Sequence, residues 1–222
     1  MENINDILSI FSVLILVSTI ALVASKRVLS YIRIFRTQAV LLAAIAAVYG
    51  IYHSIEKGHI DEIFIIVILT VIIKVYYIPK TLKRIYSNVD YQVEKDFFIN
   101  IPTAVIICCG LVVLTWFLIS GVPDINQGYS SNFLVQTLSM VLIGLFFMIS
   151  RKKAIGQIIG FLVIENGMFL AAMLLTDGMP MIVEFGIFFD LLTAVIIMGI
   201  FVFRINETFE HIDINKLRNL KG

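Results

Sequence analysis

Residues 154–175 read AIGQIIGFLVIENGMFLAAMLL and follow directly on three basic residues, Arg151 to Lys153. This stretch of 22 residues contains a single charged side chain, Glu165. An α-helix needs about 20 consecutive apolar residues to cross the hydrocarbon core of a bilayer. The stretch therefore predicts a membrane-spanning helix that starts at a basic edge and carries one acid near its middle.

Six further stretches have the same apolar character. The chain of 222 residues is 59% hydrophobic and 15% charged, and its mean hydropathy is +0.97. A soluble domain of this size needs far more polar surface. We therefore predict an all-α, polytopic transmembrane helix bundle of about seven spans, at Ile7–Ala24, Ala39–Tyr52, Ile63–Ile78, Ile99–Ile119, Phe133–Ile149, Ala154–Leu175 and Met181–Phe203.

The basic residues predict the orientation of these spans. Fifteen of the seventeen lysines and arginines lie in the tail or in the connections after spans one, three and five. The alternate connections carry only Lys57, and Lys74 falls inside a span. By the positive-inside rule, the N-terminus is outside and the C-terminus is cytoplasmic, as in a multi-pass protein of the inner (cytoplasmic) membrane.

A turn-rich stretch, GVPDINQGYSSN, divides the predicted spans into four and three. We therefore expect a four-span module over residues 1–120, an outer loop over 121–132, and a three-span module with a cytoplasmic tail over 133–222. The ends of the second span are the least defined, because that apolar run is short; its start is at Ala39 or already near Arg36.

Four ionisable side chains fall inside the predicted spans: Lys74, Glu165, Glu184 and Asp190. A rise of ~1.5 Å per residue places Glu165 about 18 Å and Asp190 about 21 Å from the same cytoplasmic edge. The two carboxylates come from consecutive antiparallel helices, so we expect them at nearly equal depth, close enough to share protons through a water. An intramembrane charge costs about 2.5–3.5 kcal/mol on insertion scales and usually marks a functional site or a pair.

The four groups suit proton translocation. A carboxyl group in a low-dielectric medium holds its proton more tightly and can load and release it near neutral pH. Glu165 and Asp190 are the predicted centre of a relay, with Lys74 and Glu184 at its ends. Two alternatives remain open for the ends: Lys74 either snorkels to the cytoplasm or is buried, and Glu184 either extends the path outward or sits at the interface. Asn166 is interpreted as a residue that makes a hydrogen bond between helices. In a structural alternative to the relay, the acids bond to neighbouring helices and carry no protons.

Other chemistries find little support in the sequence. It contains no phosphate-binding loop, no Ser-His-Asp arrangement and no cysteine–histidine cluster, and its two cysteines, Cys108 and Cys109, are adjacent. We therefore expect no cofactor, no metal and no nucleic acid on this chain. Gly156 and Gly160 form a GxxxG pattern, which permits close helix packing.

From Phe133 onward the chain resembles subunit K of NADH:quinone oxidoreductase and the C subunit of multisubunit Na⁺/H⁺ antiporters. The matching segments are IGFLVIENG at Ile159–Gly167 and EFGIFFDLLTAVIIMGIF at Glu184–Phe201, after the basic Arg151–Lys153. With KVYYIP at Lys74–Pro79, essentially the whole chain resembles component E of the hydrogenase-4 and formate hydrogenlyase type of energy-converting hydrogenases. One departure is that subunit K has its glutamate where this chain has Leu162.

The resemblance implies a non-catalytic subunit of a complex I-like oxidoreductase, without a redox centre of its own. Its implied partners are antiporter-like membrane subunits, other membrane-arm subunits and a peripheral hydrogenase arm. The implied function is ion transport, with H⁺ or Na⁺ as the coupling ion. The alternatives are a subunit of a multisubunit cation/proton antiporter and a structural membrane scaffold.

Overall fold

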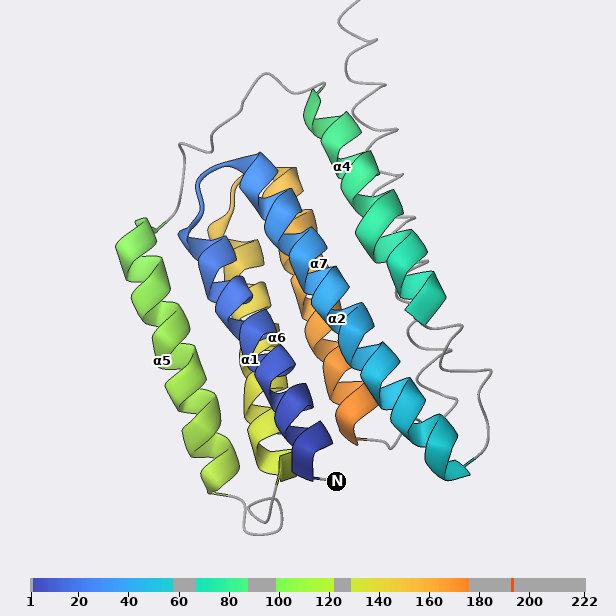
Figure 1. Ribbon diagram of the computed structural model, residues 1–222. Coiled ribbons are helices and arrows are strands. Elements are labelled where there is room, and N and C mark those ends of the chain that lie inside the picture. The colour runs from blue at the N-terminus through green and yellow to red at the C-terminus, as the bar shows by residue number, and fades with distance from the viewer. Residues whose placement is uncertain (1, 58–66, 88–98, 122–128, 176–192, 194–222) are drawn as a thin grey trace, which may run out of the picture.

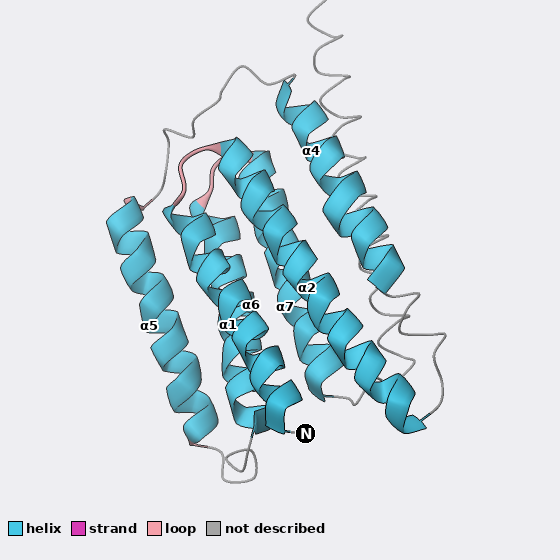
Figure 2. Cartoon of the chain, viewed as in Figure 1, coloured by secondary structure: helices cyan, strands magenta, loops and turns pink. Residues whose placement is uncertain are grey.

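The structure, a computed structural model, describes residues 2–57, 67–87, 99–121, 129–175 and 193. The regular secondary structure of these residues is helical (Figure 2). Its elements are α1 (Glu2–Ala24), α2 (Val28–Lys57), η1 (Val71–Tyr77), α4 (Ile78–Ser87), α5 (Ile101–Ser120), α6 (Tyr129–Ser150) and α7 (Ala154–Leu175).

Five of the described helices, α1, α2, α5, α6 and α7, are long and apolar enough to cross a membrane. They overlap the first, second, fourth, fifth and sixth predicted spans. The third predicted span is described from residue 67 and continues through η1 into α4. The seventh, Met181–Phe203, lies outside the described residues except for Thr193. The count of seven spans therefore stays a prediction.

The second span differs from its prediction. Its apolar window runs over Val28–Ile51, so it begins eleven residues before the predicted Ala39 and eight before the alternative start at Arg36. The reason is that Arg33 and Arg36 lie exposed on one side of α2, while Tyr31 and Phe35 on the other side are fully buried. Long basic side chains near a helix end can extend to the membrane interface without interrupting the helix.

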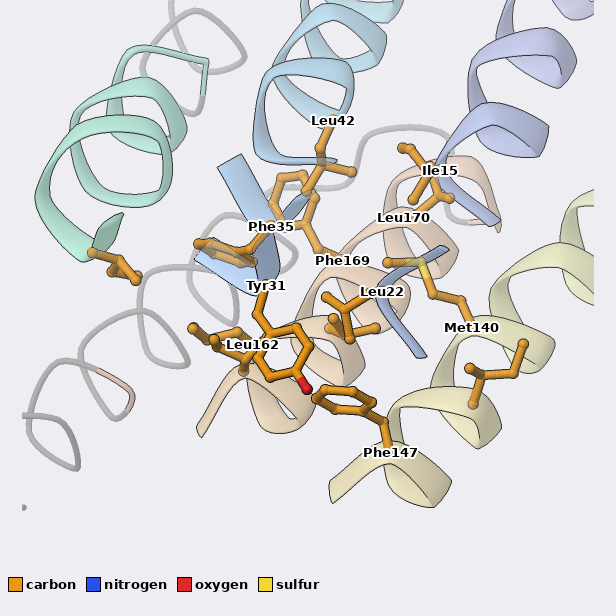
Figure 3. Packing of buried hydrophobic residues seen from close by; sticks show 14 of the residues in the cluster. Ile15, Leu22, Tyr31, Phe35, Leu42, Met140, Phe147, Leu162, Phe169 and Leu170 are labelled. Carbon is orange, nitrogen blue, oxygen red and sulfur yellow. The ribbon is translucent and has the colours of Figure 1, made fainter. Parts of the chain in front are cut away.

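The helices form one bundle in which α7 is the most enclosed candidate span and α5 the least. In Figure 1, α1 and α2 cross in front of α6 and α7, while α5 and α4 flank the group on opposite sides. α6 packs on α7, α1 and α5, and α2 packs on α1, α7, η1 and α4. Figure 3 shows the core between them, where Tyr31 meets Phe147 edge to face with ring centroids 5.3 Å apart.

The α6–α7 contact depends on glycine. A Cβ atom added to Gly160 would lie 2.9 Å from the backbone of Met148, and one added to Gly144 would lie 3.1 Å from the backbone of Ile164. These distances leave no room for a side chain, so the two helices approach closely at Gly160, one of the two glycines of the GxxxG pattern. The approach fixes the position of the middle of α7, which carries Glu165.

Two of the basic connections lie at one end of the bundle. Residues 25–27, between α1 and α2, and residues 151–153, between α6 and α7, lie together at the upper end in Figure 1. The shared end agrees with the alternation of basic connections in the sequence. Which end faces the cytoplasm stays a prediction.

Candidate functional site

The centre of the candidate site is an ion pair between two residues far apart in the sequence. The Nζ atom of Lys74, in η1, lies 2.8 Å from Oε1 of Glu165, in α7. Each side chain is only 2% exposed. Both charges are thus removed from solvent and from lipid, and each serves as the other's counter-ion.

Lys74 has two further contacts on the same turn of α7. Its ammonium donates a hydrogen bond of 3.2 Å to Oδ1 of Asn166 and lies 5.3 Å from the ring centroid of Phe169. Residues 165, 166 and 169 are neighbours on a helix surface, because three- and four-residue spacings fall on one side. The turn therefore offers the ammonium a carboxylate, an amide oxygen and the face of an aromatic ring.

Glu165 has a partner on its other oxygen as well. The hydroxyl group of Thr193 donates a hydrogen bond of 2.8 Å to Oε2 of Glu165. Thr193 is itself buried. The carboxylate is thus held from opposite sides by an ammonium group and a hydroxyl group.

An unusual helical turn positions Lys74. η1 is a π-helix, and its register is seen at its end, where the N–H of Ile78 bonds to the carbonyl of Ile73, five residues back. Pro79 follows directly, and a proline cannot donate the hydrogen bond that an α-helix would need there. Single π-helical turns are frequent at functional sites. Around this turn Ile72, Tyr76 and Tyr77 are exposed and Lys74 is buried, so the charge points inward and the apolar side chains outward.

The energetics favour keeping the pair intact. Taking two charges out of water costs several kcal/mol per ion, and close contact with additional hydrogen bonds offsets that cost. Lys74 and Glu165 have both. A proton placed on Glu165 would remove the counter-ion of Lys74.

Of the predicted site residues, the structure brings Lys74 and Glu165 together. Lys74 is buried, and not extended to the membrane surface as one alternative had it. Asn166 makes the expected hydrogen bond between helices. Asp190 and Glu184 lie outside the described residues. Sequence reasoning missed Thr193 as a partner of Glu165, although a polar residue three positions after Asp190 in an apolar run was a signal for it.

The described helices, with a buried ion pair among them, define a polytopic α-helical membrane protein. The chain belongs to the same family as the uncharacterized protein Rv0085 of Mycobacterium tuberculosis. The two are 32% identical over 209 residues, which cover 93% of this chain and 92% of that protein.

A more distant similarity links the chain to Hydrogenase-4 component E. It is 28% identical to that protein of Escherichia coli K12 over 151 residues, which cover 68% of this chain and 70% of the relative. The protein of the same name from Shigella flexneri gives the same values. No family model and no solved structure matches the chain.

Proposed function

We propose that this chain is a membrane-arm subunit of an energy-converting hydrogenase-type complex and contributes Glu165 to an ion path through the membrane. The similarity to Hydrogenase-4 component E supports the type of complex. The buried Lys74–Glu165 pair carries the proposal for ion translocation, because intramembrane ionisable pairs of this kind are typical of proton relays. The redox chemistry and its cofactors belong to partner subunits in this proposal.

Lys74 is the control element of the proposed path. While Glu165 is ionised, the ammonium lies 2.8 Å away and holds the carboxylate in its charged form. A proton arriving at Glu165 cancels that attraction, and Lys74 then loses one of the contacts that hold it in place beside α7. When Lys74 returns, it favours release of the proton from Glu165. Redox-driven changes in neighbouring subunits would set the direction of this exchange.

Asp190 is the proposed next carrier, with Glu184 further along. On the helix expected over residues 181–203, Asp190 would lie one turn before Thr193, and residues three apart are neighbours on a helix. The Thr193 hydroxyl bonds to Glu165, which supports a place for Asp190 near the same carboxylate. A water between the two acids would carry the proton.

A variant that removes both charges of the pair tests the proposal. We expect Lys74→Met/Glu165→Gln to assemble with its partner subunits, because removing both charges together leaves neither of them buried without a counter-ion. Proton uptake coupled to redox turnover in sealed vesicles should be abolished. The triple variant that adds Asp190→Asn should behave in the same way.

The single variant Glu165→Gln is the matched control for assembly, because it leaves Lys74 buried without its counter-ion. Removing one partner of a buried pair costs about 3–5 kcal/mol, so we expect the single variant to assemble less well than the double variant. Normal proton uptake by an assembled double variant would contradict the proposal.

Normal proton uptake by the double variant would support the structural alternative, in which the chain is a scaffold subunit. One observation favours this alternative. The ion pair joins α7 to η1, and η1 leads into α4, at the flank of the bundle. A purely structural pair would be replaceable without loss of transport. Uptake of radioactive sodium in the same vesicles distinguishes H⁺ from Na⁺ as the coupling ion and tests the antiporter alternative.

A further inference from the structure

Two buried amide side chains, one of them bonded to Lys74 of the ion pair, each have an atom that lacks a hydrogen-bond partner within the described part of the chain. They are Nδ2 of Asn166, in α7, and Oε1 of Gln38, in α2. Asn166 is 1% exposed and Gln38 is fully buried. One of the two atoms is a donor and the other an acceptor, so their needs are complementary.

The orientation of the Asn166 amide is fixed by its neighbour. The ammonium group of Lys74 can only donate, so the atom of Asn166 that faces it must be the oxygen, Oδ1. Exchanging oxygen and nitrogen would place two donors against each other. The Nδ2 group therefore points away from Lys74 and needs an acceptor elsewhere.

The orientation of the Gln38 amide is fixed in a similar way. Its Nε2 donates a hydrogen bond of 3.0 Å to the hydroxyl oxygen of Thr19, and the Thr19 hydroxyl donates its own proton to the carbonyl of Ile15 at 2.9 Å. Thr19 has no second proton to give to Gln38, so the facing atom of Gln38 must be the donor. Its Oε1 consequently needs a donor elsewhere.

The two amides also lie at nearly the same depth. α2 and α7 pack against each other and both begin at the upper end of the bundle in Figure 1. Gln38 is ten residues from the start of α2 and Asn166 twelve from the start of α7. At ~1.5 Å per residue these positions are about 15 Å and 18 Å from that end.

We propose that Gln38 and Asn166 hold a buried water between α2 and α7. The water accepts a hydrogen bond from Nδ2 of Asn166 and donates one to Oε1 of Gln38. Buried waters generally occupy such places, where polar groups would otherwise be unsatisfied. A second water in line with the first would serve the same two atoms.

The proposed water lengthens the chain of polar contacts that begins at the ion pair. The water continues the polar contacts from Glu165, Lys74 and Asn166 through Gln38 to Thr19 on α1. The polar contacts thus extend from η1 and α7 to α2 and α1, two helices that the relay predicted from the sequence did not include. This inference rests on the proposed function, and in it Gln38 is a positioning residue that holds the water against Asn166, the hydrogen-bond partner of Lys74.

Water-edited solid-state NMR of the full-length chain in lipid bilayers tests the water site directly. The side-chain amide signal of Asn166 is identified by its loss in Asn166→Leu. We expect this signal to receive magnetisation from water several-fold faster than the backbone amides of Val163 and Ile164 in the same helix. Equal rates would overturn the proposal, and this comparison requires no variant at position 38.

A second measurement tests the role of Gln38. Gln38→Leu should slow the transfer to Asn166 several-fold. Thr115→Val is the matched control, because Thr115 bonds to Ser139 in another buried polar contact, between α5 and α6. This control should leave the Asn166 signal unchanged. An unchanged rate in Gln38→Leu would overturn the proposed bridge.

Failure of this inference and failure of the proposed function are distinguishable. The NMR experiment records water beside two amides and not transport. A dry Asn166 would leave the vesicle result for the Lys74–Glu165 pair as it stands, and an ion-pair variant that still pumps would leave the water site as it stands.

Discussion

Arg151 is buried, although its position in a basic connection predicts an exposed side chain. It belongs to a basic connection that the charge pattern assigns to the cytoplasmic surface, yet it is 2% exposed. Its Nη2 group donates a hydrogen bond of 2.8 Å to the carbonyl of Val23 near the end of α1. The guanidinium carbon lies 4.4 Å from the ring centroid of Phe147 and 5.3 Å from that of Tyr31. Arg151 therefore joins three helices at one end of the bundle.

We expect lysine to be a poor substitute for arginine at position 151. Only the planar guanidinium can stack on Phe147 while it donates to the Val23 carbonyl. We expect Arg151→Lys to destabilise the chain by about 1–3 kcal/mol, the cost of a lost charge-assisted hydrogen bond and cation–π contact. The thermal unfolding midpoint in detergent measures the effect. Lys152→Arg is the control, because Lys152 is exposed and should tolerate the change; equal midpoints for the two variants would contradict the prediction.

At the scale of elements, the packing of α6 on α7 decides where the ion pair lies. Gly160 is where the backbone of Met148 comes closest, and Gly110, in α5, has nothing within 4 Å of the position where a Cβ would stand. The two glycines have the same helical setting and opposite surroundings. They form a matched pair for testing whether the approach of the helices matters.

We expect Gly160→Ala to destabilise the chain by about 1–3 kcal/mol, because a methyl group there must push the backbone of α6 away. Gly110→Ala should be neutral or stabilising by up to about 1 kcal/mol, because alanine favours the helix and finds open space. Thermal unfolding of both variants under one set of conditions checks this. Equal shifts in the same direction would show that the close approach is unimportant.

The π-helical turn at η1 is the element that local sequence rules do not predict. KVYYIP indicates a helix that ends or bends near Pro79, but it does not say that the preceding turn widens. The widened turn places Lys74 inward while Tyr76 and Tyr77 face outward. The widened turn packs against α2, and α2 also packs against α7.

At the scale of the whole molecule, the orientation in the membrane can be measured on described residues. The sequence predicts that the connection carrying Lys152 is cytoplasmic and that the end of α5, at Ser120, is outside. We expect Lys152→Cys to resist a membrane-impermeant thiol reagent in intact cells and to react after permeabilisation. Ser120→Cys should react in intact cells.

The natural cysteines form a suitable background for this experiment. Cys108 is buried, and Cys109 faces outward from the middle of α5, where the bilayer would cover it. Thiols react as thiolates, which a bilayer interior disfavours. The unsubstituted chain should therefore stay unlabelled. The opposite labelling pattern would reverse the predicted topology.

The sequence by itself determined the helical membrane class, five spans that match long apolar helices, and Lys74 and Glu165 as residues of interest. It could do so because crossing a bilayer requires long apolar runs, which make any charge within them conspicuous. Only the tertiary structure decided that these two charges pair, that Asn166 and Thr193 complete their contacts, and that Arg151 is buried. Those contacts join residues as many as 128 positions apart, and their geometry depends on helix approach and rotation, which apolar runs leave undetermined because nearly every face of such a helix has the same hydrophobicity.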